Sequence, residues 1–160
     1  TWEGYYDQVA DFKNIIWNIL GRLGDLVPAD MDLGYHLCYG SPADAHMVEP
    51  KDIAVLVEIA NGLVKAVNRP IQYIHMPVPV ERNDEGYFAP LEKIDLPAGT
   101  DLLLGCVHGG DPDGNATKLT AARKHATIAG IGAECGVGRI EDHSRLTDIL
   151  EQHRCLAEKG

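Results

Sequence analysis

The sequence predicts an α/β protein built on a parallel β-sheet, and three observations support this prediction. Four short apolar segments alternate with segments whose apolar residues recur at helical spacing. Crossovers of roughly 20 to 35 residues separate the expected strands, which is enough chain for a helix that returns to a parallel neighbour. Glycine or proline follows each expected strand, as in the loops of βαβ proteins.

The expected helices have a regular apolar periodicity. We expect helices over residues 11–26, 50–68, 117–127 and 144–158, and a short one over 90–93 within a polar loop. The first is an amphipathic helix whose apolar stripe is Phe12, Ile15, Ile16, Ile19, Leu20 and Leu23. Ser144 is the expected N-cap of the last helix.

The expected strands cover residues 33–39, 71–76, 101–108 and 128–135. Pro77 and Pro79 cannot donate ladder hydrogen bonds, so the second strand is expected to stop after His75. The segments 40–42 and 109–114 are rich in turn-forming residues and are predicted to be loops.

The chain length is that of one domain, residues 1–160, with a substantial core. A complete (β/α)8 barrel needs about 250 residues, so this sequence can supply about half of one. Three interpretations stay open at this point: a half barrel whose other half lies outside this sequence, a half completed by another chain, or an open doubly wound sheet.

Composition narrows the function classes. The formal net charge is −10 and the pI is near 5.0, so the surface is expected to repel nucleic acid. No apolar run approaches the roughly 20 residues of a membrane span, and no secretory signal opens the chain. We therefore expect a cytoplasmic protein with reduced cysteines, which favours metal or redox chemistry for the four thiols.

Imidazoles and thiols gather at the expected carboxyl ends of the strands. His36 and Cys38 are two residues apart on one strand and share a face, while His75, His108 and Cys135 end the other three. Parallel α/β proteins place their sites at this edge, and zinc prefers tetrahedral thiolate and imidazole ligands. His36, Cys38 and Cys135, with His75 as the fourth, are the candidate zinc ligands. Any one of them alone is more often a core cysteine or a hydrogen-bonded histidine than a ligand, and it is their position at one shared edge that favours a metal site.

The strand-end motifs also indicate a family. Residues 34–40 (Gly-Tyr-His-Leu-Cys-Tyr-Gly), the segment ending in His75, residues 104–108 (Leu-Gly-Cys-Val-His) and residues 133–139 (Ala-Glu-Cys-Gly-Val-Gly-Arg) occur in that order. They resemble the C-terminal domain of cobalamin-independent methionine synthase and its short relatives, in the uroporphyrinogen decarboxylase-like barrel superfamily. The resemblance covers nearly the whole chain and implies strands five to eight, the C-terminal half of a (β/α)8 barrel.

The resemblance also implies a chemistry. It places zinc on His36, Cys38 and Cys135, and puts His75 where the family has a glutamate ligand. It makes His108 the proton donor, in a cobalamin-independent methyltransferase acting on a thiol or related small molecule. The methyl donor would be a methylated folate or another methylated small molecule. The family's homocysteine-binding groups have no counterpart in this sequence, so a methionine synthase is not expected.

Two alternatives remain from the sequence. The first is a metal-free decarboxylase or other lyase of the same superfamily, for which Arg82 and Arg139 are the nearby arginines. The second is a non-catalytic half barrel. In either case the expected partner is a second copy in a homo-oligomer or a complementing barrel half, because open strand edges tend to pair. Cys106 is expected to share the barrel interior with His108, and Glu134 to form a structural ion pair, with Arg139 as its expected partner.

Overall fold

A computed structural model describes residues 11–40 and 49–159 of the chain. Its helices are α1 (Phe12–Asp25), α2 (Ala54–Ala66), α3 (Glu85–Phe88), α4 (Pro112–Arg123) and α5 (His143–Lys159). Two 3₁₀ turns, η2 (Ala89–Lys93) and η3 (Val137–Arg139), lie between them. The strands are β1 (Gly34–His36), β2 (Tyr73–Pro77), β3 (Asp101–Val107) and β4 (Gly130–Ala133). Residues 41 and 42 of the loop expected after the first strand lie outside the described residues.

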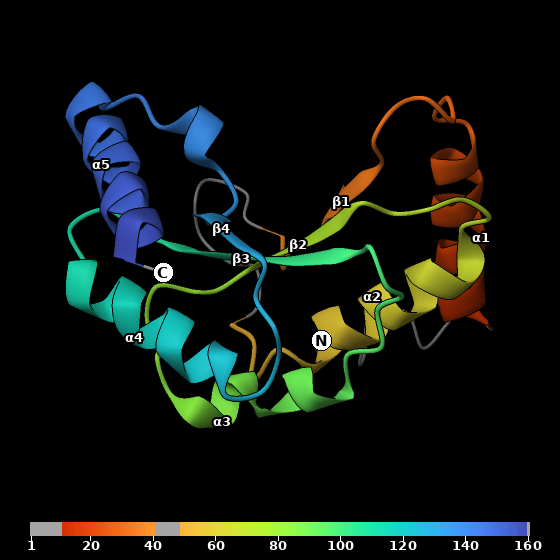
Figure 1. The fold of residues 1–160 in the computed structure, drawn as a ribbon, viewed down its shortest axis with the longest axis horizontal. Helices are drawn as coiled ribbons and strands as arrows, with labels where there is room; N and C mark the ends of the chain where they lie inside the picture. Colours follow the sequence, from red (N-terminus) through yellow and green to blue (C-terminus); the bar gives the residue numbers. More distant parts are fainter. Residues whose placement is uncertain (1–10, 41–48, 160) are drawn as a thin grey trace.

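The four strands form one parallel sheet in the order β1-β2-β3-β4. Helices α2, α3 and α4 lie along one face of this sheet, and α1 and α5 stand at its two ends (Figure 1). This arrangement confirms the predicted α/β fold with strands alternating with helices. It is consistent with half of a barrel, although the described strands do not close into one.

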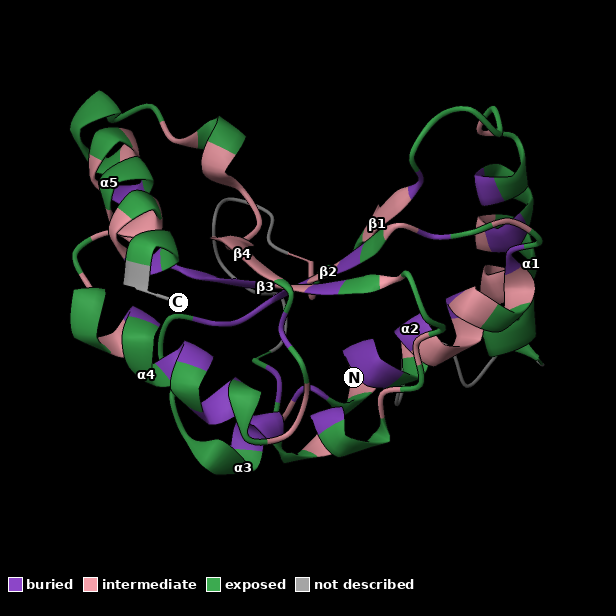
Figure 2. Ribbon diagram, in the orientation of Figure 1, coloured by how far each residue is buried: buried purple, intermediate pink, exposed green. Residues whose placement is uncertain are grey.

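The face of the sheet that α2, α3 and α4 cover carries the core, and we call it the helix-covered face. Its strand residues alternate with those of the other face, and Ile74, Met76 and Leu104 are fully buried there. In Figure 2 the buried strand positions are on β2 and β3, and further buried positions are on α2 and α4. Each Å² of apolar surface that is removed from water contributes about 25 cal/mol to the free energy of folding, so this layer is the main source of stability.

The other face, which we call the open face, is lined by glycines and by larger side chains that lie over them. Its strand residues include Gly34, His36, Tyr73, His75, Leu103, Gly105, Gly130 and Gly132. A Cβ added at Gly34 would lie 2.1 Å from the Tyr73 ring, and one added at Gly130 would lie 2.7 Å from Leu103 Cδ2. Large residues of one strand therefore fill the space that glycine leaves on the next.

Helix α1 forms where it was predicted, but much of its apolar stripe is not in the core. Ile15, Ile19 and Leu23 are 44–56% exposed. The helix packs instead through Gly21 and Gly24, where added Cβ atoms would lie 2.5 Å from Ala66 O and 2.2 Å from the Tyr35 hydroxyl oxygen. Helix α1 thus approaches α2 and β1 closely at these two glycines, while several of its apolar side chains face outward.

Strand β2 extends to Pro77, so the prediction that it stops after His75 was wrong. The His75 carbonyl accepts from Leu37 N–H at 2.9 Å, and Val78 N–H donates to the Gly105 carbonyl at 3.0 Å. Odd residues of β2 therefore point their backbone groups toward β1 and even residues toward β3. Pro77 faces the side of β1 beyond its last residue, His36, where a missing N–H costs no ladder bond.

Two helix starts also differ from the prediction because acidic side chains cap them. Helix α4 begins at Pro112, inside the segment expected to be a loop, and Asp111 caps it by accepting from Gly114 N–H at 3.0 Å. It ends at Arg123, before the expected residue 127. Helix α5 begins at His143, and Asp142 rather than Ser144 accepts at its start, from Ser144 N–H at 2.9 Å.

Candidate metal centre

Three of the predicted ligands come together at the carboxyl edge of the sheet. One ligand atom from each of His36, Cys38 and Cys135 lies within 4.8 Å of the other two. Zinc bonds of about 2.0–2.3 Å would bring such atoms to about 3.3–3.8 Å from one another, so only a small closure is needed. This group could therefore hold a metal ion.

The sheet geometry accounts for the meeting of these three residues. His36 is the last residue of β1, and Cys38 lies two residues later on the same side of an extended chain. Cys135 lies two residues after the end of β4, and Gly136 turns the chain there with φ of 104°, a conformation that favours glycine. The sheet curls enough to bring its first and last strand ends together.

The two thiols are free of disulfides and differ in accessibility. Cys38 is exposed and Cys135 is half-buried. The backbone N–H of Gly40 donates to Cys38 Sγ at 3.3 Å, which anchors the sulfur near the metal group. Reduced, accessible thiols are what a thiolate metal site requires.

His75 lies against His36 and not within the group of three. The two residues are register partners on β1 and β2, and their Nδ1 atoms are 2.7 Å apart. The rings are nearly parallel, with centroids 4.9 Å apart. Two nitrogens bound to one tetrahedral zinc would be about 3.3 Å apart, so this contact is a hydrogen bond in which one ring donates and the other accepts. The ligand role expected for His75 stays a prediction.

Both imidazoles are held in their neutral form. Burial lowers the pKa of His36, and burial together with the nearby His36 lowers the pKa of His75 to about 4. Neutral imidazole is the form that binds metals. At neutral pH neither ring has to lose a proton before it can accept a metal or a hydrogen bond.

His108, the predicted proton donor, is almost buried at the end of β3, with 8% of its surface exposed. Asn115 of α4 fixes its backbone, because Asn115 Oδ1 accepts from His108 N–H at 3.0 Å and Asn115 Nδ2 donates to the His108 carbonyl at 2.8 Å. His108 Nδ1 lies 3.5 Å from Glu134 Oε2. Glu134 was expected to make only a structural ion pair. It faces His108 and is the neighbour of Cys135 in the chain, so it lies between the predicted proton donor and a candidate metal ligand.

Cys106 does not lie on the open face, which would be the interior of a barrel, so the expectation that it points into that interior was wrong. Gly105 is the β3 residue whose Cβ direction points at the His75 ring, so the next residue points to the helices. Cys106 is fully buried there, and burial raises the pKa of its thiol to about 11, with Lys118 and Arg123 of α4 opposing this rise. It belongs to the core and not to the metal group.

A pair of phenols supports the strand end that carries Cys38. Tyr39 and Tyr87 have hydroxyl oxygens 2.8 Å apart, and burial raises both pKa values above the ordinary range of tyrosine. The Arg82 guanidinium lies 4.7 Å from the centre of the Tyr87 ring. Arg82 also donates to Asp84 at 2.9 Å and to the carbonyls of Pro50 and Lys51, so it fastens two loops.

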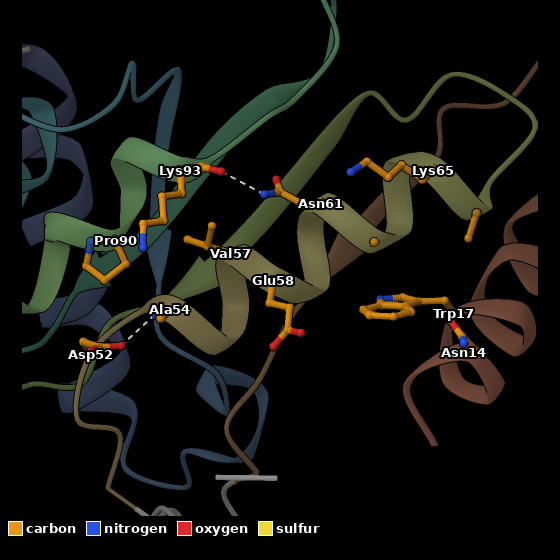
Figure 3. A pocket seen from close by; sticks show the side chains of 12 residues that line it. Asn14, Trp17, Asp52, Ala54, Val57, Glu58, Asn61, Lys65, Pro90 and Lys93 are labelled. Atoms are coloured by element: carbon orange, nitrogen blue, oxygen red, sulfur yellow. Dashed lines mark hydrogen bonds between the residues drawn. The ribbon is translucent and has the colours of Figure 1, made fainter. Parts of the chain in front are cut away.

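A surface pocket of about 780 Å³ lies elsewhere, between α1, α2 and η2 (Figure 3). Trp17 lies beside Gly62, where an added Cβ would be 2.0 Å from its Nε1. Two polar side chains of the pocket make hydrogen bonds within the protein: Asn61 donates to the Lys93 carbonyl at 2.8 Å, and Asp52 accepts from Ala54 N–H at 2.9 Å. The three candidate metal ligands are not among the residues that line the pocket, so the candidate chemistry stays at the strand ends.

In comparisons with known proteins, no family model, no curated protein and no solved structure matches this chain. The family resemblance of the strand ends therefore remains a prediction. Over residues 11–40 and 49–159, no helix is both long enough and apolar enough to cross a membrane.

Proposed function

We propose that the chain is the zinc-binding half of a cobalamin-independent methyltransferase that methylates a small-molecule thiol. The single observation that supports this most strongly is the convergence of His36, Cys38 and Cys135, three residues from the two ends of the sheet. One imidazole and two thiols form a donor set that zinc favours and that hard cations such as Mg²⁺ do not. Three protein ligands leave a position for a substrate sulfur.

Bound zinc would act as a Lewis acid that lowers the pKa of the substrate thiol. The thiolate sulfur then forms a bond to the methyl carbon, while the bond from that carbon to the donor, a methylated folate or another methylated small molecule, breaks. The donor leaves with the electron pair of that bond and takes up one proton, and the thiol proton is released to solvent. The chain's own residues position the metal and supply the proton.

His108 is the residue proposed to deliver that proton. Its Nδ1 faces the Glu134 carboxylate at 3.5 Å, and the charge of a carboxylate stabilises a protonated imidazole. Asn115 holds its backbone in place at the end of β3. With 8% exposure it could reach only a substrate that enters the carboxyl edge of the sheet.

The lyase alternative loses support from the way Arg82 is used. That reaction needs a cation free to bind a substrate carboxylate, and Arg82 was one of the two nearby arginines. Three of its nitrogens donate to Asp84, Pro50 and Lys51. Its role is therefore to fasten the loops before α2 and before α3.

The proposed partner is a complementing barrel half and not a second copy of this chain. A (β/α)8 barrel has one helix between each two neighbouring strands. This chain carries a helix before β1 and another after β4, so two copies would bring α5 of one and α1 of the other to the same junction. A half that begins and ends on a strand fits both junctions, whether another chain or a further part of the same one supplies it.

Metal content of the purified chain tests the proposal. We expect about one zinc per chain by elemental mass spectrometry, and its loss in Cys38→Ser and Cys135→Ser. Cys155→Ser is the matched control, because Cys155 lies on α5 and its Sγ is 3.5 Å from Glu151, away from the metal group. The zinc-loaded protein with its barrel half is then mixed with small thiols and a methylated folate, and mass spectrometry detects the thioether.

Folded protein that takes up no zinc would overturn the proposal at its base. Equal zinc loss in Cys155→Ser would mean that the thiols bind metal without a defined site. If the protein with its barrel half binds zinc but forms no thioether, the metal site would be supported and the methyl transfer would be excluded.

A further inference from the structure

Two glycines of the open face lie directly beneath the His75 imidazole. A Cβ added at Gly105 would come within 2.8 Å of His75 Cε1 and Nε2, and within 3.0 Å of the Ala133 carbonyl oxygen. A Cβ added at Gly132 would come within 3.0 Å of His75 Nε2 and 3.5 Å of Cδ2, and no other atom would lie within 4 Å of it. The ring thus extends from β2 across β3 to β4.

Neither glycine is needed for its backbone conformation. The described non-helical glycines with positive φ are Gly40, Gly99, Gly110 and Gly136, and neither Gly105 nor Gly132 is among them. Alanine would suit an extended backbone at both positions, and glycine weakens a strand. What glycine provides here is space for the ring that lies above it.

We infer that Gly105 and Gly132 are positioning residues of the metal centre, which act through His75. The inference rests on the proposed zinc site. The two glycines let the His75 ring lie flat, with its Nδ1 directed at His36 Nδ1, 2.7 Å away. A histidine that ligates a metal is normally oriented by a partner at its other ring nitrogen, and loss of such a partner costs about 10- to 100-fold in metal affinity.

The consequence is that small substitutions outside the ligand set should change metal binding. In Gly132→Ala the ring must move by a few tenths of an ångström, and the His36 ring loses its fixed orientation. We expect zinc affinity, measured by competition with a chromophoric chelator, to fall by about 10-fold. Gly105→Ala should lower it further, because its Cβ would lie closer to the ring.

A double-mutant cycle separates action through His75 from general disturbance. In a His75→Ala background, Gly132→Ala should leave zinc affinity unchanged, since the side chain that it displaces is gone. Gly130→Ala is the matched control on the same strand and face, because its Cβ would meet Leu103 Cδ2 at 2.7 Å and not His75. We expect it to leave zinc affinity within about twofold of wild type while lowering thermal stability.

A second readout does not depend on zinc. Imidazole ¹⁵N chemical shifts of the metal-free protein report which ring nitrogens carry protons and whether the two Nδ1 atoms share one. Gly132→Ala should change the shifts of both His36 and His75, and Gly130→Ala should change neither.

These outcomes separate the inference from the proposed function. If wild type binds no zinc, the metal proposal fails, and the ¹⁵N shifts still decide whether the glycines position the two rings. If wild type binds zinc but Gly132→Ala alters neither affinity nor shifts, the positioning role is wrong. The same loss of affinity in the His75→Ala background would also overturn it.

Discussion

The two faces of the sheet are made of the same strands and yet differ in what covers them. Ile74 and Met76 of β2 are fully buried under the helices, whereas Tyr73 on the same strand is 40% exposed and His75 is half-buried. The open face also carries the exposed His36. One residue step along a strand thus moves a side chain from a dry core to a polar, accessible layer.

This difference indicates that the two faces have different roles. Parallel sheets are normally covered on both faces, and among residues 11–40 and 49–159 helices cover only one of the two faces. The packed face supplies stability, while the open face keeps imidazoles, thiols and glycines where a metal, a substrate and a second barrel half could meet.

The largest difference is expected in thiol reactivity. Cys38 is exposed on the open side, whereas Cys106 is buried on the helix-covered face, and burial raises its pKa to about 11. The thiolate is the reactive form, so at about pH 8 only about one Cys106 in a thousand is ionised, and the fraction rises with pH up to its pKa. Mass spectrometry of the labelled, metal-free Cys155→Ser variant should show Cys38 modified at least about 100-fold faster.

Zinc sharpens this test. Saturating zinc should slow the labelling of Cys38 and Cys135 and leave Cys106 unchanged, because only the first two belong to the metal group. Native Cys106 labelled as fast as Cys38 would contradict the division between the two faces.

The next effect is expected in stability, from two neighbouring leucines of β3. Leu104 is fully buried under the helices, while Leu103 is half-buried on the open face. Leu104→Ala should lower the free energy of unfolding by about 2–5 kcal/mol, as is usual for a core leucine. Leu103→Ala should cost less than about half as much, because part of its surface already contacts water. Urea unfolding of both variants measures this, and equal losses would mean that the open face is packed like the core.

The sequence predicted the alternation of helices and strands because the spacing of apolar residues shows which of them are buried. On the helix-covered face these residues are buried between the sheet and its helices. It missed the start of α4, where the side chain of Asp111 and the ring of Pro112 begin a helix within glycine-rich chain. Composition suggested a loop there because glycine and proline usually end elements. Capping depends on one side-chain hydrogen bond, which composition does not show.

For the site, the i, i+2 spacing of His36 and Cys38 was sufficient to place both on one face, and the convergence of strand ends brought Cys135 to them. The partner of His108 was not predictable in this way. The pairing of β3 with β4 shifts between Leu104 and Val107, so simple alternation does not carry through to Glu134. Likewise, periodicity identified the apolar stripe of α1 but not that glycines on another side of the helix would make its contacts.

The smallest effect concerns that stripe and the proposed partner. Ile19 is 47% exposed, whereas the neighbouring Leu20 packs against the core. Ile19→Lys should change the free energy of unfolding by no more than about 0.5 kcal/mol, as for other exposed positions, and Leu20→Ala should cost more. The change should also reduce non-specific self-association seen by light scattering, since it breaks the exposed apolar surface.

The dependence of the unfolding midpoint on protein concentration then distinguishes a complementing barrel half from a second copy of this chain. If α1 packs only against a complementing half, the unfolding midpoint of the isolated chain is independent of concentration in wild type and in Ile19→Lys. A stable dimer of identical chains would instead make the wild-type midpoint rise with concentration, and Ile19→Lys would abolish that rise. Such a result would overturn the argument from helix number, because α1 and α5 of two copies would then have to share one junction.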